Sequence, residues 1–319
     1  MTAPTFPEVH PDLQEAARKC PSFTMTGGKL WLMRLAMRFM PMPRVPAEIL
    51  VENRHIPGPN GRRKIRLRLY RPREAAAPMP VLLWIHGGGY VIGRPELDEL
   101  VCARYAHELR ISVVSVDYRL APGQPFPAGL EDCYAALTWV HTHAGEFGID
   151  GRRIAIGGAS AGGGLAAALV QMTHDRSEIT PVCQLLVYPM LDDRTTLGAD
   201  PEEAAPLAWN RASNRFGWKS YLGPAEATQA YAVPARRTDL AGLPPAWVGV
   251  GTLDLFHDED VAYAQALQAS GVDCETVVVP GAFHGFDVFT PEAPVVETFR
   301  AAQIAALRKH MFPSDTKAN

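Results

Sequence analysis

Ser160 lies in the sequence Gly158-Ala159-Ser160-Ala161-Gly162, a pattern that suits a nucleophile. A short run typical of a strand, Arg153–Gly157, comes before it, and a small-residue run typical of a helix, 161–172, comes after it. A sharp turn between the two leaves no room for side chains at Gly158 and Gly162, and strained backbone favours glycine. The helix start would direct free N–H groups toward the serine. The alternative is a small-residue helix start without chemistry.

A serine hydroxyl needs a base that removes its proton before it can attack. His284 follows the predicted strand Glu275–Val279 and lies in the loop Gly281-Ala282-Phe283-His284-Gly285-Phe286. Other histidines lie on predicted helices or near the chain ends: His10, His107, His141, His143, His174 and His310. The position of His284 after the last predicted strand favours it as the base.

The base in turn needs a carboxylate that holds its tautomer and stabilises the imidazolium. Asp254 follows the predicted strand Ala246–Val250, which places it before His284 in the chain. Asp258, Glu259 and Asp260 begin a predicted helix, where acids interact favourably with the helix dipole, so we expect them to be capping, solvated charges. Asp254 is therefore the predicted acid, with Asp258 as the alternative.

A second glycine-rich segment, His86-Gly87-Gly88-Gly89-Tyr90, directly follows the apolar run Val81–Ile85. Acyl transfer places negative charge on the former carbonyl oxygen, and preorganised N–H donors stabilise that charge. We predict that the amides of Gly88, Gly89 and Ala161 are these donors, with His86 and Gly87 supporting the loop. A phosphate-binding loop is the alternative, but the Lys-Ser/Thr ending and the GxGxxG spacing are missing.

Strand-like and helix-like runs alternate along most of the chain. This alternation of buried strands with helices predicts an α/β fold with a mostly parallel sheet covered on both faces. Ligands of such sheets bind at the carboxyl ends of the strands, where all the segments above lie. The predicted strands are 49–54, 64–70 (half-exposed and antiparallel), 81–85, 111–116, 153–157, 182–188, 246–250 and 275–279. The predicted helices are 12–19, 30–40, 96–109, 130–147, 161–172, 258–269 and 295–309.

Two regions interrupt this order. Residues 1–45 carry a helical stripe of Leu30, Met33, Met37 and Met40, which indicates a helix packed on the core or a cap over the site, since methionine adapts to varied apolar ligands. Residues 191–240 contain no clear strand, and an insertion of this length between sheet strands is usually functional. We therefore expect a core of 46–190 and 241–319, a cap segment at 1–45 and a cap insertion at 191–240.

Composition excludes several classes of protein. The chain has 31 Lys+Arg and 34 Asp+Glu, a net charge of −3, which gives no support to nucleic-acid binding. The five cysteines form no CxxC pair, so we expect buried thiols rather than a disulfide scaffold or a zinc site. The apolar stretch Leu30–Met42 is too short and too charged to span a bilayer. We expect a cytoplasmic protein without metal or organic cofactor.

With these motifs, the chain from about residue 46 resembles the bacterial hormone-sensitive-lipase-like esterases, family IV of the α/β-hydrolase superfamily. The resemblance rests on the segment 86–89, on Asp117-Tyr118-Arg119-Leu120-Ala121-Pro122 with Phe126-Pro127-Ala128, on 153–163, and on Asp254 and His284. It implies that Asp117 and Arg119 are structural. Two departures occur, because the family usually has an acid where this chain has Ala159, and often has Asp-Pro-Leu where this chain has Asp254-Leu255-Phe256.

The resemblance implies an α/β-hydrolase fold with an eight-stranded sheet and a helical cap, and hydrolysis of short- to medium-chain carboxylic esters through an acyl-enzyme. Two alternatives stay open: an amidase or peptidase on the same fold, and a non-catalytic small-molecule receptor that keeps the scaffold. An exposed edge strand at Glu275–Val279 could also pair two subunits into a homodimer.

Overall fold

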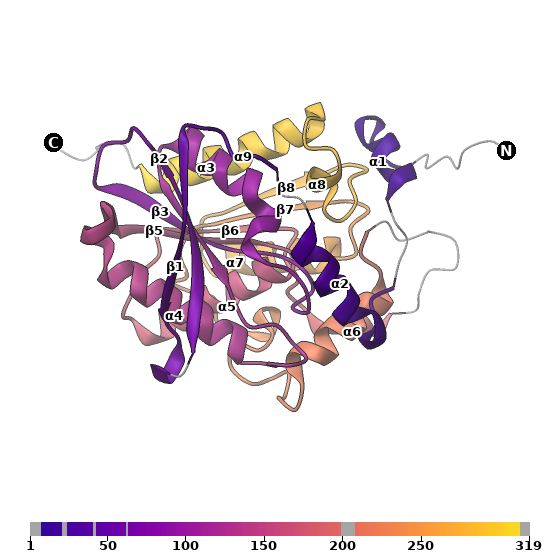
Figure 1. Cartoon of the computed structure of the whole chain (residues 1–319). Helices are drawn as coiled ribbons and strands as arrows, with labels where there is room; N and C mark the ends of the chain where they lie inside the picture. Colours follow the sequence, from indigo (N-terminus) through magenta and orange to yellow (C-terminus); the bar gives the residue numbers. More distant parts are fainter. Residues whose placement is uncertain (1–7, 21–23, 41–42, 62, 199–207, 313–319) are drawn as a thin grey trace.

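The computed structural model describes residues 8–20, 24–40, 43–61, 63–198 and 208–312 (Figure 1). Its centre is one eight-stranded sheet of order β1-β2-β4-β3-β5-β6-β7-β8, so the predicted mostly parallel eight-stranded sheet is confirmed. The strands are β1 (Ile49–Pro57), β2 (Lys64–Pro72), β3 (Met79–Ile85), β4 (Ser112–Asp117), β5 (Ile149–Ala159), β6 (Cys183–Val187), β7 (Ala246–Gly251) and β8 (Cys274–Val279).

The antiparallel pairs lie at one edge of the sheet. β1 pairs with β2, and β2 pairs with β4, where Arg66 lies opposite Asp117. Every other neighbouring pair is parallel. The prediction for 64–70 is confirmed, since β2 is antiparallel and alternates buried with partly exposed residues. β8 forms the opposite edge of the sheet, and Val278 on it is exposed.

Helices cover both faces, and the alternation of β3 shows how one strand serves two cores (Figure 1). Leu82 and Trp84 join the cluster that α3 and α9 cover, whereas Leu83 and Ile85 join the cluster that α4, α5 and α7 cover. Successive side chains of a strand point to opposite faces, so an uninterrupted apolar run suits a sheet buried on both sides. The helices are α1 (Gln14–Lys19), α2 (Gly27–Phe39), α3 (Glu99–Leu109), α4 (Ala128–Thr142), α5 (Ala161–Arg176), α6 (Arg211–Leu222), α7 (His257–Ala269), α8 (Phe286–Phe289) and α9 (Pro294–Met311).

Three predicted helices are shorter than expected. The segments 12–19 and 96–109 start as 3₁₀ turns, Pro11–Leu13 and Pro95–Asp98, before α1 and α3 begin. The segment 130–147 leaves the α-helix at Thr142 and ends as the 3₁₀ turn Ala144–Phe147. Prolines near the first position favour such tight starts, and Gly148, with φ +64°, ends the last turn in a left-handed conformation.

The N-terminal segment and the insertion lie side by side in the structure (Figure 1). The amide of Met25 donates to Ser213 Oγ at 2.9 Å, which joins the start of α2 to α6. The insertion holds two 3₁₀ turns, Asp193–Leu197 and Pro234–Arg236, around α6, and its described residues contain no strand. Parts of both predicted cap regions, namely 1–7, 21–23, 41–42 and 199–207, lie outside the described residues.

The apolar stripe of α2 faces inward over most of its length. Leu30 is buried, Met33 and Met37 pack against the core, and Met40 at the end is half exposed. Elsewhere in the described ranges, as in α2, no helix reaches the length and apolarity that crossing a bilayer requires.

Candidate active site

Ser160 occupies the turn between β5, which ends at Ala159, and α5, which begins at Ala161. Its backbone has φ +56° and ψ −123°, a conformation that L-residues rarely adopt. A Cβ at Gly158 would lie 2.4 Å from the carbonyl oxygen of Gly162, and one at Gly162 would lie 2.0 Å from that of Ile85. The glycines therefore let β5, α5 and β3 approach closely enough to hold the strained serine.

Ser160, His284 and Asp254 form one line of hydrogen bonds. His284 Nδ1 lies 2.8 Å from Asp254 Oδ2, and His284 Nε2 lies 2.9 Å from Ser160 Oγ. A carboxylate can only accept, so Nδ1 carries the proton and Nε2 is left to accept the serine hydroxyl. The structure thus brings together three side chains from the loops after β5, β7 and β8.

The carboxylate of Asp254 has both oxygens engaged. Oδ1 accepts the backbone amide of Phe256 at 2.9 Å, while Oδ2 accepts from His284. The alternative acid, Asp258, has a fully exposed side chain that pairs with His257, away from this line. The geometry therefore favours Asp254 over Asp258 as the carboxylate that binds His284.

The expectation that Glu259 and Asp260 are solvated is wrong, because α7 turns both inward. Glu259 is buried, and its Oε1 accepts the amide of Leu191 at 2.7 Å. Burial raises the pKa of Glu259 to about 8, and burial together with Glu259 and Asp254 raises the pKa of Asp260 well above its usual range. A helix start alone does not show which of its acids point toward the core.

The glycine-rich loop after β3 runs directly beside the serine. A Cβ at Gly87 would lie 3.3 Å from Ser160 Cβ. Gly88 has φ +120° and Gly89 has φ +57°, values that favour glycine. The amides of Gly88, Gly89 and Ala161 donate to no oxygen within the described ranges, so they are free to bind an anionic oxygen.

His86, predicted as a supporting residue, is fully buried at the base of this loop. Its ring stacks on Tyr118 at a centroid distance of 4.3 Å, and Nδ1 lies 2.8 Å from the carbonyl oxygen of Gly87. Burial lowers the pKa of the His86 imidazole, which favours the neutral ring. The Tyr118 hydroxyl donates to the His86 carbonyl at 2.9 Å, so Tyr118, the residue directly after β4, supports the loop.

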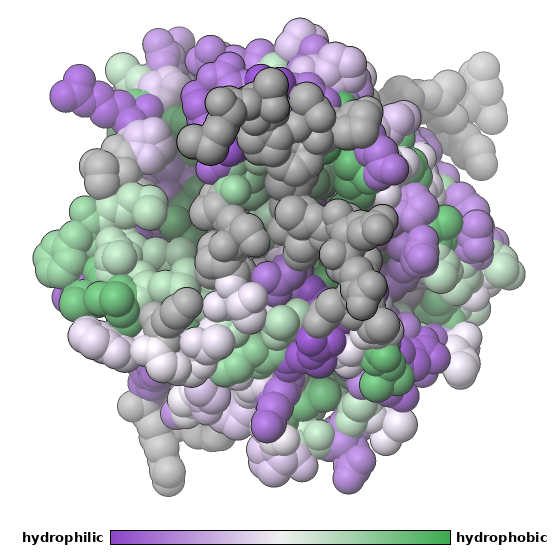
Figure 2. Space-filling view, turned by 90° about the vertical axis from the view of Figure 1, so that its right-hand side faces the viewer, coloured by the Kyte–Doolittle hydropathy of each residue, from purple (hydrophilic) through white to green (hydrophobic). Residues whose placement is uncertain are grey.

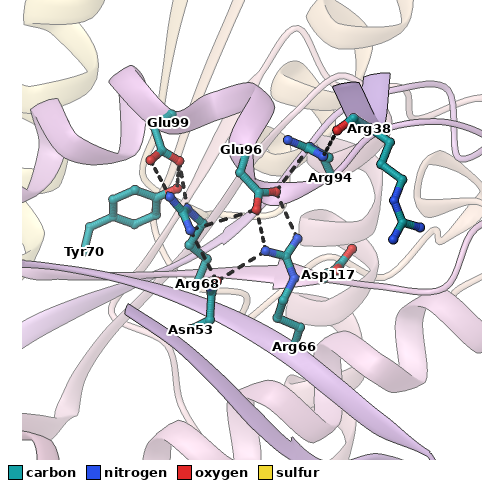
Figure 3. Close-up of polar contacts among 9 residues, drawn as sticks. All are labelled: Arg38, Asn53, Arg66, Arg68, Tyr70, Arg94, Glu96, Glu99 and Asp117. Carbon is teal, nitrogen blue, oxygen red and sulfur yellow. Dashed lines mark hydrogen bonds and ion pairs between the residues drawn. The ribbon is translucent and has the colours of Figure 1, made fainter. Parts of the chain in front are cut away.

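Asp117 and Arg119 take part in ion pairs away from the serine, in agreement with a structural role. Arg66 Nε donates to Asp117 Oδ2 at 2.8 Å and binds the carboxylate of Glu96 through its terminal nitrogens (Figure 3). The backbone amide and Nε of Arg119 both donate to Asp132 Oδ2. These pairs join β2, β4 and α4 behind the site.

Sequence reasoning missed the aromatic walls around His284. The ring of Tyr188 meets the imidazole edge-on at 5.0 Å, and the ring of Phe256 does so at 5.1 Å. Trp209 from the insertion lies at 6.5 Å, and a Cβ at Gly89 would be 2.3 Å from its indole. The aromatic residues of the insertion were a signal, but nothing in the sequence shows which of them reaches the site.

The chain also resembles characterised enzymes. Residues 82–288 match the family described as alpha/beta hydrolase fold. The carboxylesterase NlhH of Mycobacterium tuberculosis is 33% identical over 318 residues, which cover 97% of this chain and 99% of that protein. An ethyl acetate hydrolase of Pseudomonas putida is 31% identical over 224 residues, 69% of this chain and 70% of that protein.

Solved structures agree with this relationship. A structure of a bacterial heroin esterase superposes with a TM-score of 0.86 at 35% identity, over 96% of this chain and 99% of that one. This chain therefore belongs to the α/β-hydrolase family, within its hormone-sensitive-lipase-like (family IV) carboxylesterases.

Proposed function

We propose that this carboxylesterase hydrolyses its esters through Ser160 as nucleophile, His284 as general base and acid, and Asp254 as the acid that orients His284. The observation that carries the proposal is the unbroken line of hydrogen bonds from Asp254 through His284 to Ser160, at 2.8 and 2.9 Å. Such a line activates a hydroxyl that would otherwise be a poor nucleophile.

The reaction has two steps. His284 Nε2 accepts the hydroxyl proton as Ser160 Oγ bonds to the acyl carbon, and the carbonyl oxygen becomes an oxyanion facing the amides of Gly88, Gly89 and Ala161. His284 then gives this proton to the leaving alcohol, and the acyl-enzyme remains. A water molecule then loses a proton to His284 and attacks the acyl carbon. The bond between the acyl carbon and Ser160 Oγ breaks, His284 returns the proton to Oγ, and the carboxylic acid is released.

Short- to medium-chain acyl esters are the proposed substrates. Tyr188, Phe256 and Trp209 enclose His284 in aromatic surface, and Ser160 is only 8% exposed, so the reacting ester must leave bulk water. The Pseudomonas relative is named for ethyl acetate, an ester with a short acyl group. Residues 1–45 and 191–240 would form the cap that bounds this space.

The test of the triad is turnover of p-nitrophenyl acetate and butyrate by the wild type and by Ser160→Ala. We expect the variant to lose activity by about 10⁶-fold, as in other serine hydrolases. Ser177→Ala, at an exposed serine just beyond α5, is the matched control and should retain full activity. Undiminished turnover by Ser160→Ala would contradict the proposal, as would an organophosphate adduct mapped to another residue.

The proposal of a cap has its own test. Removing residues 1–40 should change the ratio of activities on acetate and octanoate esters, because one wall of the acyl space is lost. An unchanged ratio would remove the cap from the proposal. Cytoplasmic location and a homodimer paired through β8 stay predictions.

A further inference from the structure

The carbonyl groups of the loop after β3 are held from several directions, while two of its amides stay free. The carbonyl of Gly88 accepts the amides of Val91 and Ile92 at 3.0 Å. The carbonyl of Tyr90 accepts the amide of Ala121 at 3.0 Å, and the Tyr90 hydroxyl donates to Met190. A carbonyl and the amide that follows it share one planar peptide unit. The bonds to the Gly88 carbonyl therefore set where the free Gly89 amide points, and the contact of the Gly87 carbonyl with His86 Nδ1 does the same for the Gly88 amide.

Arg34 binds the next carbonyl of this loop, that of Val91. From α2, its Nε donates to the carbonyl oxygen of Val91 at 2.9 Å, and its Nη2 donates to that of Ala121 at 2.6 Å. One planar guanidinium thus bridges the loops that follow β3 and β4. Hydrogen bonds from a charged donor are shorter and about twice as strong as neutral ones.

The surroundings of Arg34 set it apart from an ordinary surface arginine. The side chain is partly buried, and burial lowers its pKa. No carboxylate of the described chain lies within ion-pair distance of it. Its charge is therefore directed at carbonyl dipoles alone, whereas Arg66 and Arg94 pair with the carboxylate of Glu96.

We propose that Arg34 is a positioning residue of the esterase reaction, which holds the Gly88 and Gly89 amides in the orientation that binds the oxyanion. The inference rests on the proposed role of those amides. It extends the catalytic machinery to the N-terminal helix α2, which otherwise only bounds the acyl space. The effect acts through Val91, two residues after Gly89, and through Ala121, which itself holds Tyr90.

The chain offers a matched control one turn further along α2. Arg38 is exposed, and its side chain points away from the ion pairs around Glu96, with only its backbone carbonyl accepting from Arg94 at 3.4 Å (Figure 3). Arg38→Met therefore removes the same charge from the same helix and leaves every contact of the loop in place.

The experiment compares Arg34→Met with Arg38→Met on p-nitrophenyl acetate, butyrate and octanoate. Loss of one oxyanion donor costs about 100- to 1,000-fold in kcat, so misorienting the donors should lower kcat of Arg34→Met by about tenfold. We expect the same factor on all three esters, an unchanged KM, and an Arg38→Met variant equal to the wild type. A trifluoromethyl ketone, whose adduct places an oxyanion in the same position, should lose affinity by the same factor.

Two further variants keep the proposal testable. Arg34→Lys retains the charge but not the planar fork, so its kcat should fall between those of the wild type and Arg34→Met. In Arg34→Ala, added guanidinium at low millimolar concentration should restore part of the lost kcat, which a role confined to folding would not allow.

The inference is wrong if Arg34→Met matches Arg38→Met in kcat, or if its loss depends on acyl length or appears only in KM. If any of these outcomes is found while Ser160→Ala is inactive, the proposed function is retained and only the role of Arg34 is rejected. Activity that survives in Ser160→Ala would remove the proposed function itself.

Discussion

Two glycine-rich loops meet at the reacting centre, and they are held in different ways. The turn at Ser160 is held by close backbone packing, since Gly158 and Gly162 touch each other and β3. The loop at Gly88 is held by side chains from distant segments, including Tyr118 on the stretch after β4 and Arg34 on α2. Both loops contain residues with positive φ, but the first is held by backbone groups, whereas the second also depends on side chains from distant segments.

The difference predicts that substitutions at the two loops affect different properties of the protein. A substitution at the Ser160 turn changes packing at the centre of the sheet and therefore endangers the fold. A substitution among the anchors of the Gly88 loop removes one or two hydrogen bonds, so it should lower kcat without endangering the fold.

The largest effect should come from Asp254→Asn. An amide in place of the carboxylate favours the wrong tautomer of His284, so kcat should fall by about 10⁴-fold while the protein stays folded. The measurement is kcat on p-nitrophenyl butyrate together with Tm. Asp258→Asn, at the exposed neighbouring acid, should match the wild type, and an equal loss in both variants would exclude a specific role for Asp254.

The next effect should come from Gly162→Ala, which tests the packing of the Ser160 turn. The added methyl group would lie 2.0 Å from the carbonyl oxygen of Ile85, so β3 and α5 must move apart. We expect a loss of about 3 kcal/mol in the free energy of unfolding, measured in urea. Gly145→Ala, where a Cβ meets nothing within 4 Å, should change stability little, and similar losses in both would contradict close packing as the cause.

Glu259→Gln tests the segment at Met190 and Leu191, which contacts both loops. Its effect on stability should be smaller than that of Gly162→Ala. The amide of Met190 donates to the Ser160 carbonyl, the Met190 carbonyl accepts from Tyr90, and the neighbouring Leu191 amide donates to Glu259. Burial raises the pKa of Glu259 from 4.5 to about 8 in the folded protein.

The sign of the pH dependence follows from that shift. Between pH 4.5 and about 8 the folded protein holds a proton on Glu259 that the unfolded chain has released, so wild-type stability falls as pH rises through this range. Glutamine cannot titrate, so the free energy of unfolding of Glu259→Gln should not show this decrease with pH. Relative to the wild type the variant should gain stability from pH 5 to pH 8, and parallel curves would contradict the prediction.

The smallest effect should come from Tyr118→Phe, which removes one anchor of the Gly88 loop. The lost hydrogen bond to the His86 carbonyl is worth about 1 kcal/mol of stability, and kcat should fall by about fivefold with KM unchanged. Tyr134→Phe, at a tyrosine outside the site, is the control. A kcat equal to that of the wild type would mean that the loop keeps its position without this bond.

Much of the sheet and the proximity of Ser160, Asp254 and His284 could be predicted because the signals are local. Apolar runs such as Val81–Ile85 identify buried strands, and the glycines around Ser160 identify a turn that needs them. The carboxyl ends of parallel strands share one edge, which is why residues as far apart as Ser160 and His284 could be placed together.

The remaining features depend on contacts between distant segments. Arg34 reads as a charge that interrupts an apolar stripe, and only the fold shows that it reaches Val91 and Ala121. Glu259 reads as a solvated helix acid, although it is buried against Leu191. In α6, glycine and polar residues weaken the helical pattern, so no helix is predicted there.

The contact between Trp209 and Gly89 joins the insertion to the Gly88 loop and has a consequence for redesign. With the indole 2.3 Å from where a methyl group at position 89 would sit, the two positions form a single steric unit. Enlarging residue 89 requires shrinking residue 209. In libraries that randomise position 89 and keep Trp209, most variants will therefore have a steric clash between the two residues. Varying both positions together allows a larger residue at 89 to be combined with a smaller one at 209.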